Sequence, residues 1–269
     1  MIHYTDRGEG EAIILIHGYL ETSEVWDHFA EKLADRFRVI AVDLPGHGKS
    51  DLTDETLTME LMAGLIKDLI GNLGLKRVFI TGHSLGGYVT LAFLDLWPEL
   101  LKGCCLFHSH PLENTPENIK KRNSEISVVQ AGNKDLIYPG NIARLFANEN
   151  LRKFHSQRMR SENIASEIPG EAIIAVLRGM ILRPSRVNVM EEGRVPCLWI
   201  LGKRDNYIDF EKVRSAIRLP SNAELAVLEN SGHIGFIEEE DKSLRILSDF
   251  AARCFRTKKI TPGRSYLFR

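Results

Sequence analysis

Hydrophobic residues along the chain fall into short, nearly continuous runs separated by longer segments of mixed polarity. Apolar runs of this length are typical of parallel strands that are covered on both faces. They occur at residues 12–16, 38–43, 77–82, 103–108, 196–202 and 223–229. Residues 2–8, "IHYTDRG", predict one further short strand that leads into a turn.

The segments between these runs have the apolar spacing of amphipathic helices. They lie at residues 23–35, 58–73, 86–97, 210–217 and 240–256. Because strands and helices alternate, we expect an α/β fold with a mostly parallel, doubly wound sheet of seven or eight strands and right-handed crossovers.

One interval, residues 111–190, contains no convincing buried strand. Its pattern predicts helices at 116–131, 141–161 and 170–182. Thr115 is placed to cap the first of them, with Pro116 at its first position. We therefore expect a core of residues 1–110 and 191–269 that is interrupted by a helical insertion at 111–190.

Composition and charge narrow the function classes. The formal net charge of the 269 residues is −1, which provides no basic field for nucleic acid. No stretch approaches the roughly 20 apolar residues of a membrane span, and the N-terminus lacks the charged and apolar regions of a signal peptide. We expect a cytoplasmic protein with a small-molecule partner and no nucleic-acid or membrane partner, and find no signal for an oligomeric state.

The cysteines carry no metal-binding or redox spacing. Neighbouring residues on a strand point to opposite faces, so Cys104 and Cys105 cannot share one simple site. We interpret them, with Cys197 and Cys254, as small buried hydrophobic residues.

Residues 82–86, Gly-His-Ser-Leu-Gly, match the pattern G-x-S-x-G between a predicted strand and a predicted helix. Glycines permit a sharp turn there, which would expose the Ser84 hydroxyl beside the positive end of a helix. The context therefore predicts that Ser84 is a nucleophile.

A serine nucleophile needs a base, and that base needs an orienting acid. Asp205 lies three residues past Gly202 at a predicted strand end, and His233 lies in the turn after the next strand. Singly, each is an ordinary loop residue, but the order Ser, Asp, His is the one expected for this turn. Asp209 is a rival acid, although its place before a predicted helix favours a cap.

Acyl transfer also needs donors for an oxyanion. The backbone N–H of Leu85 and an N–H from the loop after the first buried strand would supply them, and Tyr19 is our candidate for the second. The Tyr19 ring could equally form a pocket wall or simply pack. Further candidates for lining a substrate pocket are His83, His108, His110 and Ile234.

Five segments together resemble the α/β-hydrolase family, in its serine hydrolase branch. They are "HGYLETSEVW" (17–26), "DLPGHGKS" (43–50), "GHSLGG" (82–87), "LGKRDNYID" (201–209) and "SGHIGFIEE" (231–239). The resemblance implies the α/β-hydrolase fold, a helical cap at 111–190 and a structural role for His47. Relatives that dehalogenate or open epoxides have aspartate where this chain has Ser84. Some relatives place the acid directly after the strand predicted at 103–108, and the absence of an acid at residues 109–111 favours Asp205.

The leading hypothesis is a carboxylesterase-like serine hydrolase of small or medium esters, with no metal or organic cofactor. Three alternatives stay open. The same Ser84, Asp205 and His233 could hydrolyse a carbon–carbon bond or act as a lyase on a carboxylated substrate. Arginines of the insertion would bind the carboxylate, and the candidates are Arg122, Arg144, Arg152, Arg158 and Arg160. The protein could use peroxide in place of water, or the fold could hold a small molecule without catalysis.

Overall fold

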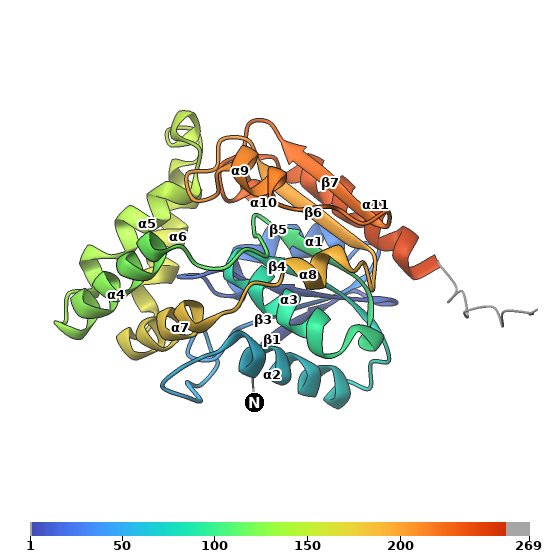
Figure 1. Ribbon diagram of the computed structural model, residues 1–269, viewed down its shortest axis with the longest axis horizontal. Helices are drawn as coiled ribbons and strands as arrows, with labels where there is room; N and C mark the ends of the chain where they lie inside the picture. The colour runs from blue at the N-terminus through green and yellow to red at the C-terminus, as the bar shows by residue number, and fades with distance from the viewer. Residues whose placement is uncertain (1, 257–269) are drawn as a thin grey trace, which may run out of the picture.

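The computed structural model describes residues 2–256, and a seven-stranded sheet forms their centre (Figure 1). The strand order is β1-β3-β2-β4-β5-β6-β7. β1 is antiparallel to β3 and the other pairs are parallel. The bounds are β1 (Tyr4–Arg7), β2 (Ala12–Ile16), β3 (Arg38–Val42), β4 (Val78–His83), β5 (Leu101–Phe107), β6 (Cys197–Gly202) and β7 (Ala223–Leu228). All six apolar runs and the short first segment are confirmed as strands, which gives seven strands in the described residues. The expected burial is wrong for β7, an edge strand in which only Leu228 is buried and Glu224 is exposed.

Helices cover both faces of the sheet, so its central strands are buried as their continuous apolar sequences require. On one face α2 packs against α3 and α3 against α8, while α1 packs against α11 on the other (Figure 1). The bounds are α1 (Asp27–Leu33), α2 (Met59–Asn72), α3 (Leu85–Leu96), α8 (Val187–Glu191), α9 (Phe210–Ser215), α10 (Gly235–Glu238) and α11 (Glu240–Arg256). Short 3₁₀ helices are η1 (Ser23–Trp26) and η2 (Pro98–Leu100).

The helical insertion lies to one side of the sheet, where α4 packs on α7 and α5 on α6 (Figure 1). Its elements are α4 (Pro116–Gln130), η3 (Lys134–Leu136), α5 (Tyr138–Leu145), η4 (Asn148–Asn150), α6 (His155–Glu167) and α7 (Gly170–Leu182). The Thr115 side chain accepts a hydrogen bond from the N–H of Asn118, so the predicted cap and first position of α4 are confirmed.

The single helix predicted at 141–161 is wrong, because the chain breaks there into α5 and α6. At the break Phe146 is fully buried, and the Ala147 N–H donates to Glu238 Oε1 at 2.9 Å. The carbonyl of Leu145 accepts from the N–H of His233 at 2.7 Å. The break therefore follows from contacts with the core segment around His233, which no local pattern reveals.

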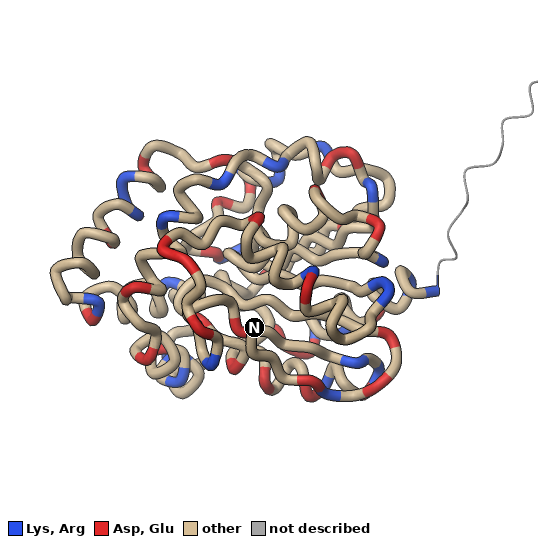
Figure 2. The backbone as a smooth tube through the Cα atoms, turned by 90° about the horizontal axis from the view of Figure 1, so that it is seen from below, with Lys and Arg blue, Asp and Glu red and all other residues tan. Residues whose placement is uncertain are grey.

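The structure places the cysteines and the charged residues as follows. All four cysteines are buried and unpaired, as expected. Basic and acidic residues intermingle along the backbone, with no face of one sign in this view (Figure 2). Over residues 2–256, every helix is too short or too polar to cross a bilayer. Residues 257–269, which the sequence assigns to the core, lie outside the described part of the chain.

Candidate active site

The turn between β4 and α3 presents Ser84 in a strained backbone conformation, with φ 48° and ψ −109°. Its flanking glycines allow two close backbone approaches. A Cβ atom on Gly82 would lie 2.1 Å from the Gly86 carbonyl oxygen, and one on Gly86 would lie 2.4 Å from that of Ile16. The glycines therefore permit a turn that leaves Ser84 half-buried at the wall of a pocket.

Asp205 and His233 meet although 28 residues separate them, because β6 and β7 are neighbouring parallel strands that end at the same edge. His233 Nδ1 and Asp205 Oδ2 lie 2.7 Å apart, and both side chains are almost completely buried. The other carboxylate oxygen of Asp205 accepts from the N–H groups of Tyr207 at 2.7 Å and Ile208 at 2.9 Å. Asp209 instead caps α9 by accepting from the N–H of Lys212, as its position suggested.

The surroundings keep Asp205 ionised. Burial alone would raise the pKa of this carboxyl group, but the neighbouring imidazoles of His233 and His108 and the hydrogen bond from His233 lower it far below its usual range. A carboxylate can only accept, so the proton of their short hydrogen bond sits on His233 Nδ1. Nε2 of His233 is then the nitrogen that is free to take a proton from a reacting group.

His108 is a second imidazole beside the acid. The Gly235 N–H donates to its Nε2 at 3.0 Å, which leaves the proton on Nδ1. That nitrogen faces Asp205 Oδ2 at 3.6 Å, and burial lowers the pKa of His108 to about 4. The atoms of His108, Asp205 and His233 are close enough to surround a metal ion, but each imidazole nitrogen facing the carboxylate already carries a proton. An imidazole held by a carboxylate in this way can act as a base through its other nitrogen.

The predicted oxyanion donors come from the segments that follow β2 and β4, which are neighbouring parallel strands. Leu85 is the first residue of α3, where helix N–H groups have no partner within the helix. Tyr19 follows β2 and contributes to the pocket wall. The loop is held in a sharp curl, because the Gly18 N–H donates to Glu21 Oε2 at 2.6 Å and Leu20 has a φ of 60°.

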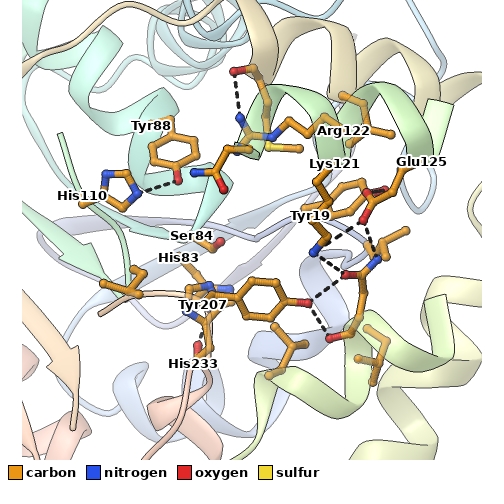
Figure 3. A pocket seen from close by; sticks show the side chains of 18 residues that line it. Tyr19, His83, Ser84, Tyr88, His110, Lys121, Arg122, Glu125, Tyr207 and His233 are labelled. Carbon is orange, nitrogen blue, oxygen red and sulfur yellow. Dashed lines mark hydrogen bonds and ion pairs between the residues drawn. The ribbon is translucent and has the colours of Figure 1, made fainter. Parts of the chain in front are cut away.

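The pocket lies between the core and the helical insertion, and its cavity volume is about 130 Å³. Cavities of about 150 Å³ admit a molecule the size of benzene. Ser84, His83, Tyr207 and His233 lie toward one side of the view, and Lys121, Tyr19 and Glu125 toward the other (Figure 3). Two hydrogen bonds join the core to the insertion across the pocket, from Tyr19 to Glu125 (3.2 Å) and from Tyr207 to the Asn141 carbonyl (2.8 Å). Within the insertion, Asn141 donates to Glu125 (3.2 Å).

Of the four other residues predicted to line the pocket, two line it and two do not. His83 and His110 line the pocket, with His110 Nε2 3.3 Å from the Tyr88 hydroxyl. The expectation for His108 and Ile234 is corrected, since neither lines this pocket. His108 lies behind Asp205, and Ile234 turns fully into the core where α10 begins. His47 is buried with Nδ1 2.9 Å from the Pro45 carbonyl oxygen, consistent with a structural role.

Sequence reasoning missed two residues at this site. The Tyr207 ring lies 5.0 Å from that of His233, and its position two residues after the predicted acid was a usable signal. Glu21 is fully buried and hydrogen bonded to His83 at 2.8 Å. No local signal marks it, because the same loop holds a second acid, Glu24, which is exposed.

Comparisons with known proteins agree with this architecture. Residues 13–244 match the model of the alpha/beta hydrolase family. The chain is 45% identical over 94 residues to an uncharacterized protein of Mycobacterium tuberculosis, a match spanning 35% of this chain and 28% of that protein. It is 26% identical to a 2-hydroxy-6-oxononadienedioate/2-hydroxy-6-oxononatrienedioate hydrolase of Pseudomonas putida, covering 93% of this chain and 91% of the relative.

A solved structure extends the likeness to three dimensions. The malate-bound thermophilic esterase from Thermogutta terrifontis superimposes with a TM-score of 0.90 at 25% identity. The match covers 94% of this chain and 93% of that one. The sheet order, the turn that carries Ser84 and the family match over most of the sequence lead to one conclusion: the chain belongs to the α/β-hydrolase family.

Proposed function

We propose that the protein is a serine hydrolase of small or medium esters, with Ser84 as nucleophile, His233 as base and Asp205 as the orienting acid. The observation that carries the proposal is the 2.7 Å hydrogen bond between His233 and Asp205 beside the pocket that Ser84 lines. The small volume of the pocket supports a short acyl or alcohol group, and the helical insertion would act as the cap of the site.

The steps follow from the positions of the donors and acceptors. Ser84 Oγ attacks the ester carbonyl while His233 Nε2 takes its proton, and Asp205 stabilises the imidazolium that forms. The N–H groups of Leu85 and Tyr19 hold the oxyanion of the tetrahedral intermediate. His233 then protonates the leaving alcohol, and water, activated by the same nitrogen, releases the acid from Ser84.

Covalent labelling with a fluorophosphonate tests the nucleophile and separates an enzyme from a non-catalytic binder. The wild-type protein should gain the mass of one adduct, and Ser84→Ala should gain none. Ser185→Ala, which removes an exposed serine hydroxyl outside the pocket, should label like wild type. Labelling that persists in Ser84→Ala would reject the nucleophile, and a folded wild type that resists labelling would favour the binder.

A carboxylated substrate is the second candidate, because Arg122 lines the pocket without an acidic partner. No ion pair within residues 2–256 involves Arg122, which instead donates to Asn114 and to the Met180 carbonyl. The Pseudomonas putida relative is named for hydrolysis of dioates, and the Thermogutta terrifontis esterase was solved with malate.

Paired esters that end in either a carboxylate or a methyl group distinguish the two candidates. A carboxylated substrate predicts a kcat/KM preference for the acid that Arg122→Gln lowers at least tenfold. A preference for the methyl ester that Arg122→Gln leaves unchanged would favour neutral esters. Carboxylated substrates with a cleavable carbon–carbon bond belong in the same panel, because the proposed nucleophile and base could serve both reactions.

A further inference from the structure

We propose that Glu21 and His83 form a buried charged pair that positions the oxyanion loop and the main chain of His233 for the reaction. The inference deepens the proposed function and rests on it. Neither residue is assigned to the chemical step. Both are positioning residues, which act through neighbours that would contact the substrate.

Three short hydrogen bonds link segments that are distant in the sequence. The Gly18 N–H donates to Glu21 Oε2 at 2.6 Å, and His83 Nδ1 lies 2.8 Å from the same oxygen. His83 Nε2 lies 2.8 Å from the main-chain carbonyl oxygen of His233. The chain of contacts runs from the loop after β2, through the last residue of β4, to the turn after β7.

Counting protons leaves two ways to make these contacts, one neutral and one charged, and the electrostatics of the pair favour the charged one. The His233 carbonyl can only accept, so His83 Nε2 carries a proton. Glu21 Oε2 already accepts from Gly18, and it can either donate a carboxyl proton to a neutral His83 Nδ1 or, as a carboxylate oxygen, accept from a protonated one. Burial opposes a charged imidazole, but the Glu21 carboxylate and the bond to His233 raise the pKa of His83, and the His83 contacts lower that of Glu21 against burial.

The positions of the linked groups suggest what the pair does. Gly18 directly precedes Tyr19, the proposed second oxyanion donor, and His83 directly precedes Ser84. The contacts therefore hold the residues directly before Tyr19 and Ser84, and the main chain of the proposed base His233 itself. A buried ion pair gains little net stability over apolar packing, so stability alone does not account for a charged pair at this place.

Glutamine at position 21 cannot reproduce these contacts. A single oxygen, Oε2, meets both Gly18 and His83. If the glutamine oxygen took that place, His83 would need a full positive charge without a counter-ion to keep both of its bonds. If the glutamine nitrogen took it, an N–H donor would face the donor of Gly18. Either arrangement releases one of the three contacts.

The test compares Glu21→Gln, His83→Gln and the double variant with wild type. The probes are p-nitrophenyl acetate as substrate and a trifluoromethyl ketone as an analogue of the tetrahedral intermediate. We expect each single change to lower kcat about 10- to 100-fold, the range seen for residues that orient metal ligands, with little change in KM. Ketone affinity should fall in parallel with kcat/KM, and the double variant should be no worse than either single one.

Glu240→Gln is the matched control. It removes the charge of another glutamate that contacts a histidine, 2.6 Å from His28, outside the pocket that Ser84 lines. Its kcat and ketone affinity should stay within about twofold of wild type, even if its melting temperature falls. A thermal melt of every variant separates lost positioning from lost fold.

The outcomes separate this proposal from the function on which it rests. Wild-type protein without Ser84-dependent turnover or labelling would overturn both. Active wild type with wild-type kcat in Glu21→Gln would overturn the pair alone, as would a lower kcat with unchanged ketone affinity. If the single variants do not fold, kcat and ketone affinity are measured on the double variant, which has no charge at either position. The same outcomes then support or overturn the pair. Failure of all three to fold would assign the pair a structural role and overturn the proposal.

Discussion

Replacing Asp205 by asparagine should reverse the proton arrangement of His233 without changing the shape of the site. Oδ1 of Asp205 accepts from two N–H groups, so the asparagine carbonyl oxygen should keep that place. Its NH₂ group would then occupy the Oδ2 position, 2.7 Å from His233 Nδ1 and 3.6 Å from His108 Nδ1. Both of those nitrogens are donors in the native protein. His233 must therefore move its proton to Nε2 to keep the hydrogen bond.

A proton on Nε2 blocks removal of the Ser84 proton, so the predicted effect falls on kcat. The corresponding change in a serine protease triad lowers kcat about 10⁴-fold, equivalent to about 5 kcal/mol in the activation free energy. We expect a loss of that order here. The assay is hydrolysis of p-nitrophenyl acetate under saturating substrate, with circular dichroism to verify the fold.

Asp209→Asn is the matched control, because Asp209 is the nearby acid that caps α9. Asparagine caps a helix about as well as aspartate. Both turnover and stability should therefore stay close to wild type. A folded Asp205→Asn protein whose kcat lies within tenfold of wild type would refute the reasoning, and a large loss in Asp209→Asn instead would identify the rival acid.

Further predictions concern the base, the buried histidines and the glycines. His233→Ala should lower kcat at least 10³-fold with an unchanged far-ultraviolet spectrum, and loss of the spectrum would mark a structural residue. Burial lowers the pKa of His108 to about 4 and that of His110 to about 3, so the unfolded chain binds more protons below about pH 6.5. The free energy of unfolding from urea titrations should fall as pH drops from 6.5 to 4, and a constant value would contradict the neutral state of these groups. Gly86→Ala places Cβ 2.4 Å from the backbone and should lower the melting temperature strongly, whereas Gly71→Ala in α2, with open space around it, should raise it slightly.

Much of the core could be predicted because its strands lie between two layers of helices. Burial on both faces selects continuous apolar runs such as residues 12–16 and 196–202, and those runs are visible without knowing their neighbours. The insertion is different. Its helix predicted at 141–161 breaks because Leu145 and Ala147 bond to core groups around His233 and Glu238. Local helical spacing carries no information about such partners.

For the candidate site, the sequence by itself determined which residues could supply a nucleophile, a base and an acid. It could do so because the strained turn at Ser84 needs glycines, and because parallel strands deliver Asp205 and His233 to one edge of the sheet. Only the tertiary structure decided the proton positions and charges. Glu21 reads locally as a solvent-exposed acid, yet it faces His83 across 62 residues of chain. The charge of such a group depends on what its buried atoms face, and that is fixed only when distant segments pack together.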